Sequence, residues 1–444
     1  MNGYKAYKLW HKYFNRKTLL SVFDEKIKNK TSVGLDWITS ESFENNINKN
    51  IETIIKKCCS STYKFTRYRE LLISKGSSSP PRCISIPTIR DKLLLSIINM
   101  IINGVYGSSA ISEMPQVIIN SIKKELDTEK YTTYIKIDIS SFYSSINHDI
   151  ILKKIKRKIR KRELLYIIES AIKTETINPS SLSQKLYRKE GVPEGLSISN
   201  SLANIYLNNI DEKYSYNQDK YSYWRYVDDI LILTSTNMAE KQKSNIINDL
   251  DKLGLKCNEE KSVVGGISSG FEYLGYCFTS GLISVRKKSV ISFERAIDSI
   301  FRNYCSSDNK NAEYLQWKVN LKITGFVIDG HKYGWLFFYS QINDLKAIAH
   351  LDWLVMRFAK RYKINPNIRF KKFMRSYNEI TRALHTTNYI PNLDLYTVDE
   401  KRRIVQNIYG ENTKNRNDEV VAGRFRKLMN REIRDIQKDV QSFS

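Results

Sequence analysis

The sequence is poor in the residues that interrupt folded structure. Among 444 residues only 8 are proline and 18 are glycine, while 41% are hydrophobic. Long disordered tracts are richer in proline and glycine and poorer in apolar residues, so we expect most of the chain to fold. Its length exceeds the usual size of one hydrophobic core and predicts several packed substructures.

Cysteine and long apolar runs are also scarce. The 6 cysteines show no CxxC spacing and are too sparse for a disulfide scaffold, so we expect reduced thiols. The longest apolar stretch, residues 93–105, is interrupted by Ser96, Asn99 and Asn103 and is too short to span a bilayer. Because the N-terminus also lacks a signal-peptide core, the sequence predicts a soluble, cytoplasmic protein with no membrane partner.

Acidic residues are fewer than basic ones: the chain has 72 Lys and Arg but only 47 Asp and Glu, which leaves a formal net charge of +25. This excess favours nucleic acid as a partner; general solubility or attraction to an anionic membrane surface are the alternatives. Residues 153–162 contain eight Lys or Arg, and Ile155 and Ile159 within them suit a helix with one buried stripe. A solvated helix face is the alternative to nucleic-acid contact here. The candidate contacts are Lys153, Lys154, Arg157 and Arg160.

Residues 134–146, YIKIDISSFYSSI, begin with strict alternation of apolar and polar side chains. This pattern predicts a strand with Ile135 and Ile137 on one face and Lys136 and Asp138 on the other. Asp138 therefore ends the strand on its polar side. An isolated aspartate at such a place is more often a turn former or a helix cap.

A second segment, YWRYVDDILIL at residues 223–233, places two adjacent carboxylates between an aromatic run and an apolar run. It predicts a hairpin with Asp228 and Asp229 at its tip, where the two charges repel unless cations offset them. With Asp138 from a neighbouring strand they would form the oxygen-rich cluster that Mg²⁺ prefers. Two such ions can activate a hydroxyl and stabilise a departing pyrophosphate. An ordinary type I′ turn built on Asp-Asp is the alternative.

The remaining pattern divides the chain in two. Short strands and helices alternate from residue 126 to 280, which predicts a mixed α+β domain built on a sheet. Beyond about residue 285, apolar residues recur every three or four positions and Arg- and Lys-rich segments intervene. This part is predicted to be a basic helical domain.

Taken in order, these segments resemble the reverse transcriptase family over roughly residues 31–285. The resemblance begins at VGLDWITSESFE, residues 33–44, and includes the family's YxDD box at residues 226–229. It implies an α+β right-hand polymerase followed by a basic, all-α, thumb-like domain. The implied ranges are 1–128 and 149–190 for the fingers, 129–148 and 191–284 for the palm, and 285–444 for the thumb.

The resemblance also implies the metal site. Asp138 and Asp228 would ligate two Mg²⁺ ions, for which Mn²⁺ can substitute, and Asp229 would support them. Ile139 is a further metal-binding position. Lys261 matches a family lysine that stabilises the pyrophosphate leaving group.

Further matches concern nucleotide, template and primer. Lys75 and Arg82 resemble the residues that clamp the triphosphate, and Tyr143 matches the aromatic residue that excludes a 2′-hydroxyl. Gly195 is a further nucleotide-binding position. It belongs to a glycine loop that resembles the template-positioning motif, but Glu194 stands where the family usually has Gln. A carboxylate cannot donate the hydrogen bonds of an amide. The primer grip is matched by Tyr273, Leu274 and Gly275.

Among bacterial members, LANIYLNNID at 202–211 and residues 322–345 look most like the defence-associated "unknown group" and abortive-infection enzymes. This implies a cytoplasmic bacterial enzyme acting against phage, with dNTPs as substrates, a cognate structured non-coding RNA as template and DNA as product. The oligomeric state is left open. The alternatives are a template-independent or protein-primed DNA polymerase, a group II intron or retron reverse transcriptase, and a non-catalytic RNA-binding scaffold.

Overall fold

The computed structural model describes residues 2–28, 32–74, 80–180, 190–215, 220–413 and 416–440. The chain divides into two compact units, and each is considered by itself. Unit 1 comprises Met1–Glu113 and Thr133–Val264, and unit 2 comprises Met114–Thr132 and Gly265–Ser444. Most of the predicted fingers and most of the predicted palm thus share unit 1, whereas unit 2 takes residues 114–128 of the predicted fingers and begins before the predicted thumb.

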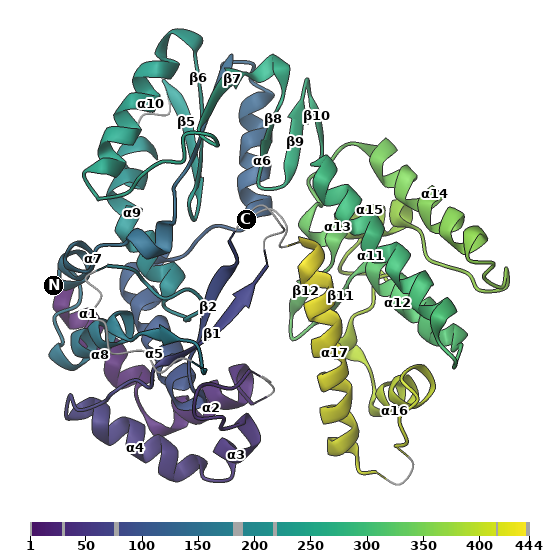
Figure 1. The fold of residues 1–444 in the computed structure, drawn as a ribbon, viewed down its shortest axis with the longest axis horizontal. Coiled ribbons are helices and arrows are strands. Elements are labelled where there is room, and N and C mark those ends of the chain that lie inside the picture. Colours follow the sequence, from purple (N-terminus) through teal and green to yellow (C-terminus); the bar gives the residue numbers. More distant parts are fainter. Residues whose placement is uncertain are drawn as a thin grey trace. The chain divides into compact units, whose positions relative to one another are not determined.

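Unit 1 consists of helices around two small sheets (Figure 1). Its helices are α1 (Asn2–Tyr13), α2 (Arg16–Lys26), α3 (Ser40–Glu44), α4 (Ile47–Cys59), α5 (Ile89–Tyr106), α7 (His148–Lys156), α8 (Arg162–Lys173), α9 (Ser199–Ser215) and α10 (Thr236–Asp251), with short 3₁₀ turns η1 (Gly107–Ala110) and η2 (Phe142–Ser145). Its strands are β1 (Tyr68–Ile73), β2 (Arg82–Ile86), β3 (Thr133–Asp138), β4 (Thr176–Ile177), β5 (Tyr221–Tyr226), β6 (Asp229–Thr234) and β7 (Val263–Gly266), the last of which crosses the unit boundary.

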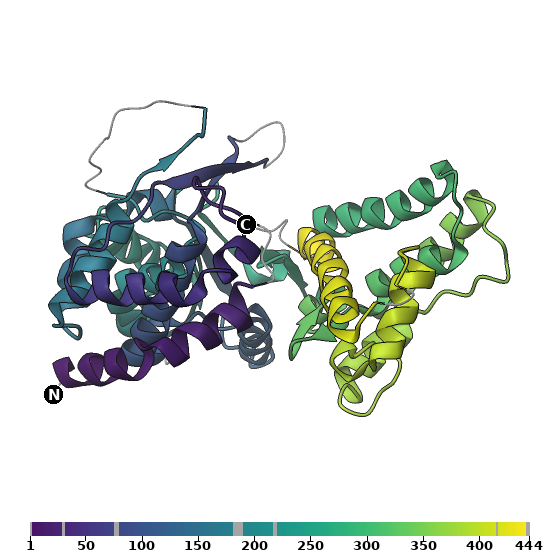
Figure 2. The same cartoon turned by 90° about the horizontal axis from the view of Figure 1, so that it is seen from below.

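One sheet has the strand order β5-β6-β3-β7, and β6 pairs antiparallel with both β3 and β5. The run Ile230–Leu233 in β6 is fully buried, which explains why it is continuously apolar rather than alternating. The other sheet has the order β2-β1-β4, and its β1–β2 hairpin projects from the helices of unit 1 (Figure 2). These observations confirm the predicted α+β class.

Helix α5 lies in the core of unit 1. Among the described residues one helical stretch, Ile89–Leu126, is apolar and long enough to cross a membrane by length and composition. Within it, α5 buries Leu93, Ile97 and Ile101 completely. Packing in a protein core therefore accounts for the apolar composition of α5.

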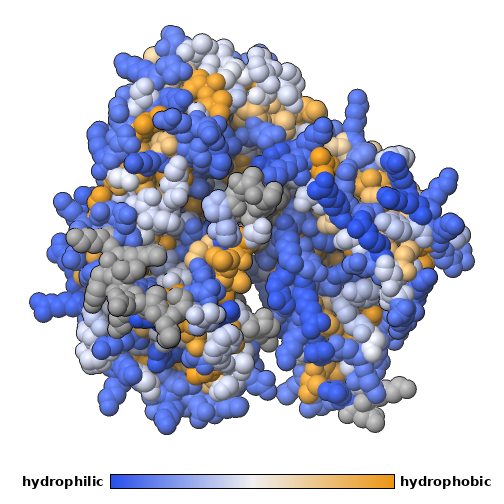
Figure 3. All heavy atoms as spheres, viewed as in Figure 1, coloured by the Kyte–Doolittle hydropathy of each residue, from blue (hydrophilic) through white to orange (hydrophobic). Residues whose placement is uncertain are grey.

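The face of the molecule seen in Figure 3 is mostly hydrophilic, with small, separate hydrophobic patches. Unit 2 is predominantly helical, as the sequence predicts. Its helices are α6 (Pro115–Leu126), α11 (Lys287–Ser306), α12 (Ala312–Thr324), α13 (Trp335–Phe338), α14 (Leu345–Arg361), α15 (Phe373–Arg382), α16 (Val398–Arg403) and α17 (Asp418–Val440), with η3 (Ile267–Ser269), η4 (Leu393–Leu395) and the π-helical turn η5 (Ile404–Ile408). It also contains strands β8 (Phe271–Tyr273), β9 (Tyr276–Thr279), β10 (Leu282–Val285), β11 (Phe326–Ile328) and β12 (His331–Tyr333).

The hairpin of β11 and β12 is an addition to the helical C-terminal domain that the sequence predicts. Its turn residues Asp329 and Gly330 both have positive φ, at 53° and 69°. Asp-Gly is the residue pair that a type I′ hairpin turn favours. The sequence therefore carries a local hairpin signal within the C-terminal domain that is otherwise predicted to be helical.

Candidate active site

The register of the β5-β6-β3 strands brings the predicted carboxylates to one end of the sheet. Asp138 is the last residue of β3 and lies directly opposite Asp229, the first residue of β6. On the other side of β6, Asp229 pairs with Tyr226, the last residue of β5. Asp228 lies in the two-residue connection between these strands. Asp138 and Asp229, which are 91 positions apart in the sequence, therefore meet through strand pairing.

The connection between β5 and β6 consists of Val227 and Asp228. Val227 has φ of 57°, and Asp228 is not among the described residues with positive φ. A type I′ turn needs positive φ at both central residues. The alternative prediction of an ordinary type I′ turn built on Asp-Asp is therefore wrong. A β-branched residue in the left-handed region is a conformational outlier that the surrounding structure must hold in place.

Burial and mutual repulsion act on the hairpin carboxylates. Burial raises the pKa of Asp228, and the nearby Asp138 carboxylate raises it further. Burial also raises the pKa of Asp229 to about 6; the Lys136 ammonium opposes this shift, and the carboxylates of Asp228 and Asp138 add to it. The three carboxylates are thus close enough to destabilise one another's charge, and a cation bound among them would relieve that cost.

Two lysines already contact this group. Lys261 Nζ lies 3.4 Å from Asp138 Oδ2, and Lys136 Nζ lies 3.8 Å from Asp229 Oδ1. Among the residues that the structure describes, no three His, Cys, Asp or Glu side chains form a ready-made metal-binding group. The donor chemistry nevertheless fits a divalent ion, because three partly buried carboxylates supply the oxygen ligands that Mg²⁺ and Mn²⁺ prefer.

Ile139 and Ser262 fix the end of β3. The Ile139 N–H donates to the Asp228 carbonyl at 3.1 Å and so joins β3 to the turn. The Asp138 N–H donates to Ser262 Oγ at 3.4 Å. The role of Ile139 as a metal-binding position stays a prediction.

Tyr143, Arg82 and Glu194 lie together near the hairpin. Burial raises the pKa of the Tyr143 hydroxyl to about 12, and the carboxylates of Glu194 and Asp228 add to the shift. Arg82 Nε donates to Glu194 Oε2 at 2.5 Å, although the two residues are 112 positions apart. The predicted triphosphate-clamping arginine is therefore paired with the residue that departs from the family pattern.

Glycine is required at position 195 because its backbone lies close to that of Ser85. Its φ is 99°, and a Cβ there would lie 2.7 Å from Ile84 Cγ2 and 3.0 Å from the Ser85 carbonyl oxygen. Beside it, the Ser85 N–H donates to the Glu194 carbonyl at 2.7 Å. The glycine thus lets its loop pack on β2, and its predicted contact with nucleotide stays a prediction.

The basic run differs from its prediction in two ways. It spans the end of α7 and the start of α8 instead of forming one helix, although Ile155 and Ile159 are buried as expected. Lys154 is also buried, and its ammonium donates to the Tyr206 carbonyl. Lys154 is therefore withdrawn as a nucleic-acid contact, because its charge is turned inward. The other three candidates, Lys153, Arg157 and Arg160, are exposed.

Four further candidates come from other parts of the sequence. Lys75 falls outside the described residues. Tyr273, Leu274 and Gly275 belong to unit 2, where Leu274 and Gly275 form the β8–β9 turn with φ of 48° and 80°. Tyr273 and Leu274 are buried. Their contact with a primer stays a prediction.

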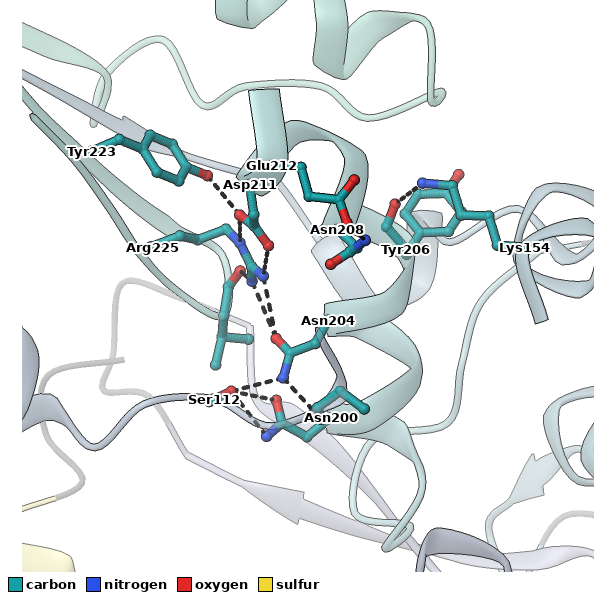
Figure 4. Close-up of polar contacts among 12 residues, drawn as sticks. Ser112, Lys154, Asn200, Asn204, Tyr206, Asn208, Asp211, Glu212, Tyr223 and Arg225 are labelled. Atoms are coloured by element: carbon teal, nitrogen blue, oxygen red, sulfur yellow. Dashed lines mark hydrogen bonds and ion pairs between the residues drawn. The ribbon is translucent and has the colours of Figure 1, made fainter. Parts of the chain in front are cut away.

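Sequence reasoning missed Arg225, which contacts the turn itself (Figure 4). Its side chain is only 8% exposed, and it donates to both oxygens of Asp211, to Asn204 Oδ1 and to the Val227 carbonyl. One signal was available: an arginine in a strand of largely buried neighbours must have partners for its charge.

Comparisons with known proteins match the part of the chain that contains this site. Residues 73–278 match the family model described as "Reverse transcriptase (RNA-dependent DNA polymerase)". Protein YkfC of Escherichia coli is 22% identical over 344 residues, covering 67% of this chain and 87% of that protein. The group II intron-encoded protein LtrA of Lactococcus lactis is 24% identical over 212 residues, covering 46% of this chain and 34% of that protein.

An uncharacterized 91 kDa protein in the cob intron of Schizosaccharomyces pombe is 29% identical over 170 residues; the match covers 36% of this chain and only 20% of that protein. Among solved structures, telomerase from Candida albicans in complex with a telomeric RNA fragment has a TM-score of 0.47 at 15% identity, covering 86% of this chain and 68% of that one. The family match encloses the three carboxylates, Tyr143 and Arg82. Residues 73–278 therefore form a reverse transcriptase domain.

Proposed function

We propose that this chain is an RNA-directed DNA polymerase. The observation that carries the proposal is the meeting of Asp138, Asp228 and Asp229 at one end of an antiparallel sheet inside the reverse transcriptase domain. Two Mg²⁺ ions, or Mn²⁺ in their place, would activate the primer 3′-hydroxyl and stabilise the departing pyrophosphate. Asp138 and Asp228 are the proposed shared ligands. Asp229, which Lys136 contacts, has the supporting role.

The surrounding side chains suit a deoxynucleoside triphosphate. Lys261 is 65% exposed and can exchange its contact with Asp138 for one with the leaving pyrophosphate. Arg82 offers a planar fork to phosphate oxygens once it is released from Glu194. Tyr143 keeps its hydroxyl proton at neutral pH, since its pKa is raised to about 12, and its ring would exclude a ribose 2′-hydroxyl sterically.

The test is primer extension on a defined RNA template with Mg²⁺ and the four dNTPs. We expect complementary DNA from the unaltered chain and a loss of at least about a thousandfold in rate for Asp228→Asn, because a neutral amide is a poor ligand for a hard cation. Asp249→Asn is the matched control. Asp249 accepts hydrogen bonds from Lys213 and Tyr214 on the surface of the same unit. Equal activity in Asp228→Asn and the unaltered chain would refute the proposed site.

Product sequencing distinguishes the alternative polymerases. DNA complementary to the supplied RNA supports templated synthesis, whereas homopolymeric or random DNA joined to peptide would indicate the template-independent or protein-primed activity.

The similarity to LtrA favours a group II intron-type reverse transcriptase as a second candidate. RNA splicing assisted by the purified chain would support that candidate. Activity unchanged in cells by loss of Asp228 would point to the non-catalytic scaffold.

We further propose that the enzyme acts in the bacterial cytoplasm against phage, with a cognate structured non-coding RNA as template. This finer assignment is supported by the resemblance of residues 202–211 and 322–345 to defence-associated members. Sequencing the RNA and nascent DNA that co-purify with the chain from its host would identify template and product together. Co-purified RNA unrelated to the DNA would refute it.

A further inference from the structure

The carbonyls of the Val227–Asp228 turn are each held by a specific donor. In a two-residue hairpin, the backbone groups of the two flanking strands form hydrogen bonds with each other. The carbonyls of the turn residues must find other hydrogen-bond donors. The Asp228 carbonyl accepts from the Ile139 N–H at 3.1 Å, and the Val227 carbonyl accepts from Arg225 Nη1 at 2.8 Å. The backbone on both sides of the Asp228 Cα is therefore tied to a neighbouring group.

Arg225 can hold the turn because it is itself fixed to α9. Its Nε lies 2.7 Å from Asp211 Oδ1, and its Nη2 lies 2.5 Å from Asp211 Oδ2, a two-point contact that sets the plane of the guanidinium. Asn204 Oδ1 accepts from both terminal nitrogens at 3.3 Å. Figure 4 shows these groups converging from one side of α9 and from β5.

The acceptors on α9 are in turn oriented by other partners. Tyr223, on the same strand as Arg225, donates its hydroxyl to Asp211 Oδ1 at 2.8 Å. Asn204 Nδ2 donates to Ser112 Oγ at 2.9 Å, which leaves its oxygen facing Arg225. The network thus extends from Ser112 and α9 through Arg225 to the turn (Figure 4).

The need for such an anchor follows from the conformation of Val227. With φ of 57°, this β-branched residue occupies a region that few side chains tolerate. Without a bond to its carbonyl, Val227 would return to a negative φ and the turn would change shape. Asp228, the next residue, would then move relative to Asp138.

We propose that Arg225 is a positioning residue for the reaction: it holds Val227 in the left-handed conformation and thereby places the Asp228 carboxylate beside Asp138. The inference rests on the proposed function and adds a role for the Asp211–Arg225–Asn204 network (Figure 4). Arg225 does not touch substrate in this role. Its effect passes through the Val227 carbonyl.

The first test is Arg225→Lys. Lysine keeps the charge but lacks the fork that contacts Asp211 and Val227 together. We expect kcat to fall on the order of 100-fold, as for a misplacement of about 1 Å at a reacting group, while KM for primed RNA is unchanged. Binding of Mn²⁺ to the free protein, followed by electron paramagnetic resonance, should weaken in parallel. Unchanged kcat and Mn²⁺ affinity would overturn the proposal.

The decisive test is rescue at the turn. Glycine adopts positive φ without steric cost, so Val227→Gly should restore much of the kcat and Mn²⁺ affinity lost in Arg225→Lys. Val227→Ala removes nearly the same side chain but keeps the Cβ, and it should not rescue. If neither variant rescues, or both rescue equally, Arg225 acts on the fold and the proposal is wrong.

Two aspartate variants distinguish an effect of the Arg225 network on kcat from a general loss of stability. Asp211→Asn removes the charge that fixes Arg225, whereas Asp249→Asn removes a similar carboxylate that contacts Lys213 and Tyr214. We expect lower kcat only in the first, with thermal unfolding recorded for both. Equal effects on kcat would overturn the proposal. Inactivity of the unaltered chain on primed RNA would instead refute the proposed polymerase function, and the Mn²⁺ binding series would still test Arg225.

Discussion

At the scale of single residues, the pairing of Arg82 with Glu194 gives the departure from the family pattern a physical meaning. A glutamine at position 194 could not neutralise the arginine, whereas the glutamate contacts its guanidinium at 2.5 Å. If Arg82 binds the triphosphate, as proposed, the Glu194 carboxylate occupies the guanidinium that the triphosphate needs, and an incoming nucleotide would have to displace it.

Glu194→Gln should therefore lower the KM for dNTPs. The Arg82 and Glu194 side chains are 35% and 24% exposed, so solvent screens the pair and the expected change is about two- to fivefold. Steady-state primer extension at varied dNTP concentration measures it. Glu175→Gln is the control, because Glu175 lies 3.5 Å from Arg67 in the same unit. An unchanged or higher KM in Glu194→Gln would contradict the competition between carboxylate and triphosphate.

Lys154 predicts a pH dependence of stability. Burial lowers its pKa from 10.5 to about 8. The unfolded chain therefore binds more protons between pH 8 and 10.5, and this residue makes the free energy of unfolding rise with pH across that window. Below pH 8 the cost of its buried charge is fully present. Lys154→Met should raise the free energy of unfolding at pH 7 by on the order of 1 to 2 kcal/mol.

Denaturant unfolding of both proteins from pH 7 to 10.5 checks this prediction. The difference between Lys154→Met and the unaltered chain should shrink as the pH rises from 8 to 10.5, because the buried lysine of the folded chain then loses its charge. A difference that stays constant with pH would show that packing, and not charge, separates the two proteins.

At the scale of elements, local sequence patterns predicted strands and helices well. They did not predict which residues far apart in the sequence contact one another. Alternation around Ile135 and the adjacent pair Asp228 and Asp229 placed the carboxylates on a strand end and a hairpin. The contact of Arg225 with Asp211 was not predictable, because it depends on how β5 lies against α9. The inward turn of Lys154 was missed for the same reason: composition cannot tell which lysine of a basic run faces the core.

Two glycines of the β11–β12 region offer a test of close packing. A Cβ on Gly325 would lie 2.2 Å from the Tyr333 carbonyl oxygen, whereas a Cβ on Gly330 would meet nothing within 4 Å. Both have positive φ, so both alanine variants bear the conformational cost of about 1 to 2 kcal/mol. Gly325→Ala should lose at least about 2 kcal/mol more, because backbone must move.

Thermal or denaturant unfolding of Gly325→Ala and Gly330→Ala compares the two costs directly. Equal losses would mean that the hairpin can separate from the end of α12 without disturbing unit 2. A larger loss in Gly330→Ala would contradict the packing around Gly325.

At the scale of the whole molecule, the net charge of +25 predicts electrostatic binding of nucleic acid. The affinity for primed RNA should fall steeply with salt, with a log–log slope of up to about −0.9 for each phosphate neutralised. Replacing Lys153, Arg157 and Arg160 with alanine should reduce that slope by about 2 to 3 if each contacts a phosphate. Fluorescence anisotropy at several salt concentrations measures both slopes.

Lys154→Met is the control for the salt dependence, because Lys154 is buried and should leave the slope unchanged. An affinity independent of salt would contradict the electrostatic account. A slope unchanged by the triple replacement would show that the exposed basic run lies away from the RNA.

The discontinuous make-up of unit 2 has a consequence for how the chain is made. Residues 114–132, which contain α6, leave the ribosome long before the rest of their unit, Gly265–Ser444. During that interval Ile118, Ile119 and Ile122, buried in the finished structure, have no completed unit to pack into. A nascent chain would need to shield this apolar surface, and a fragment starting at Gly265 would lack part of its own unit.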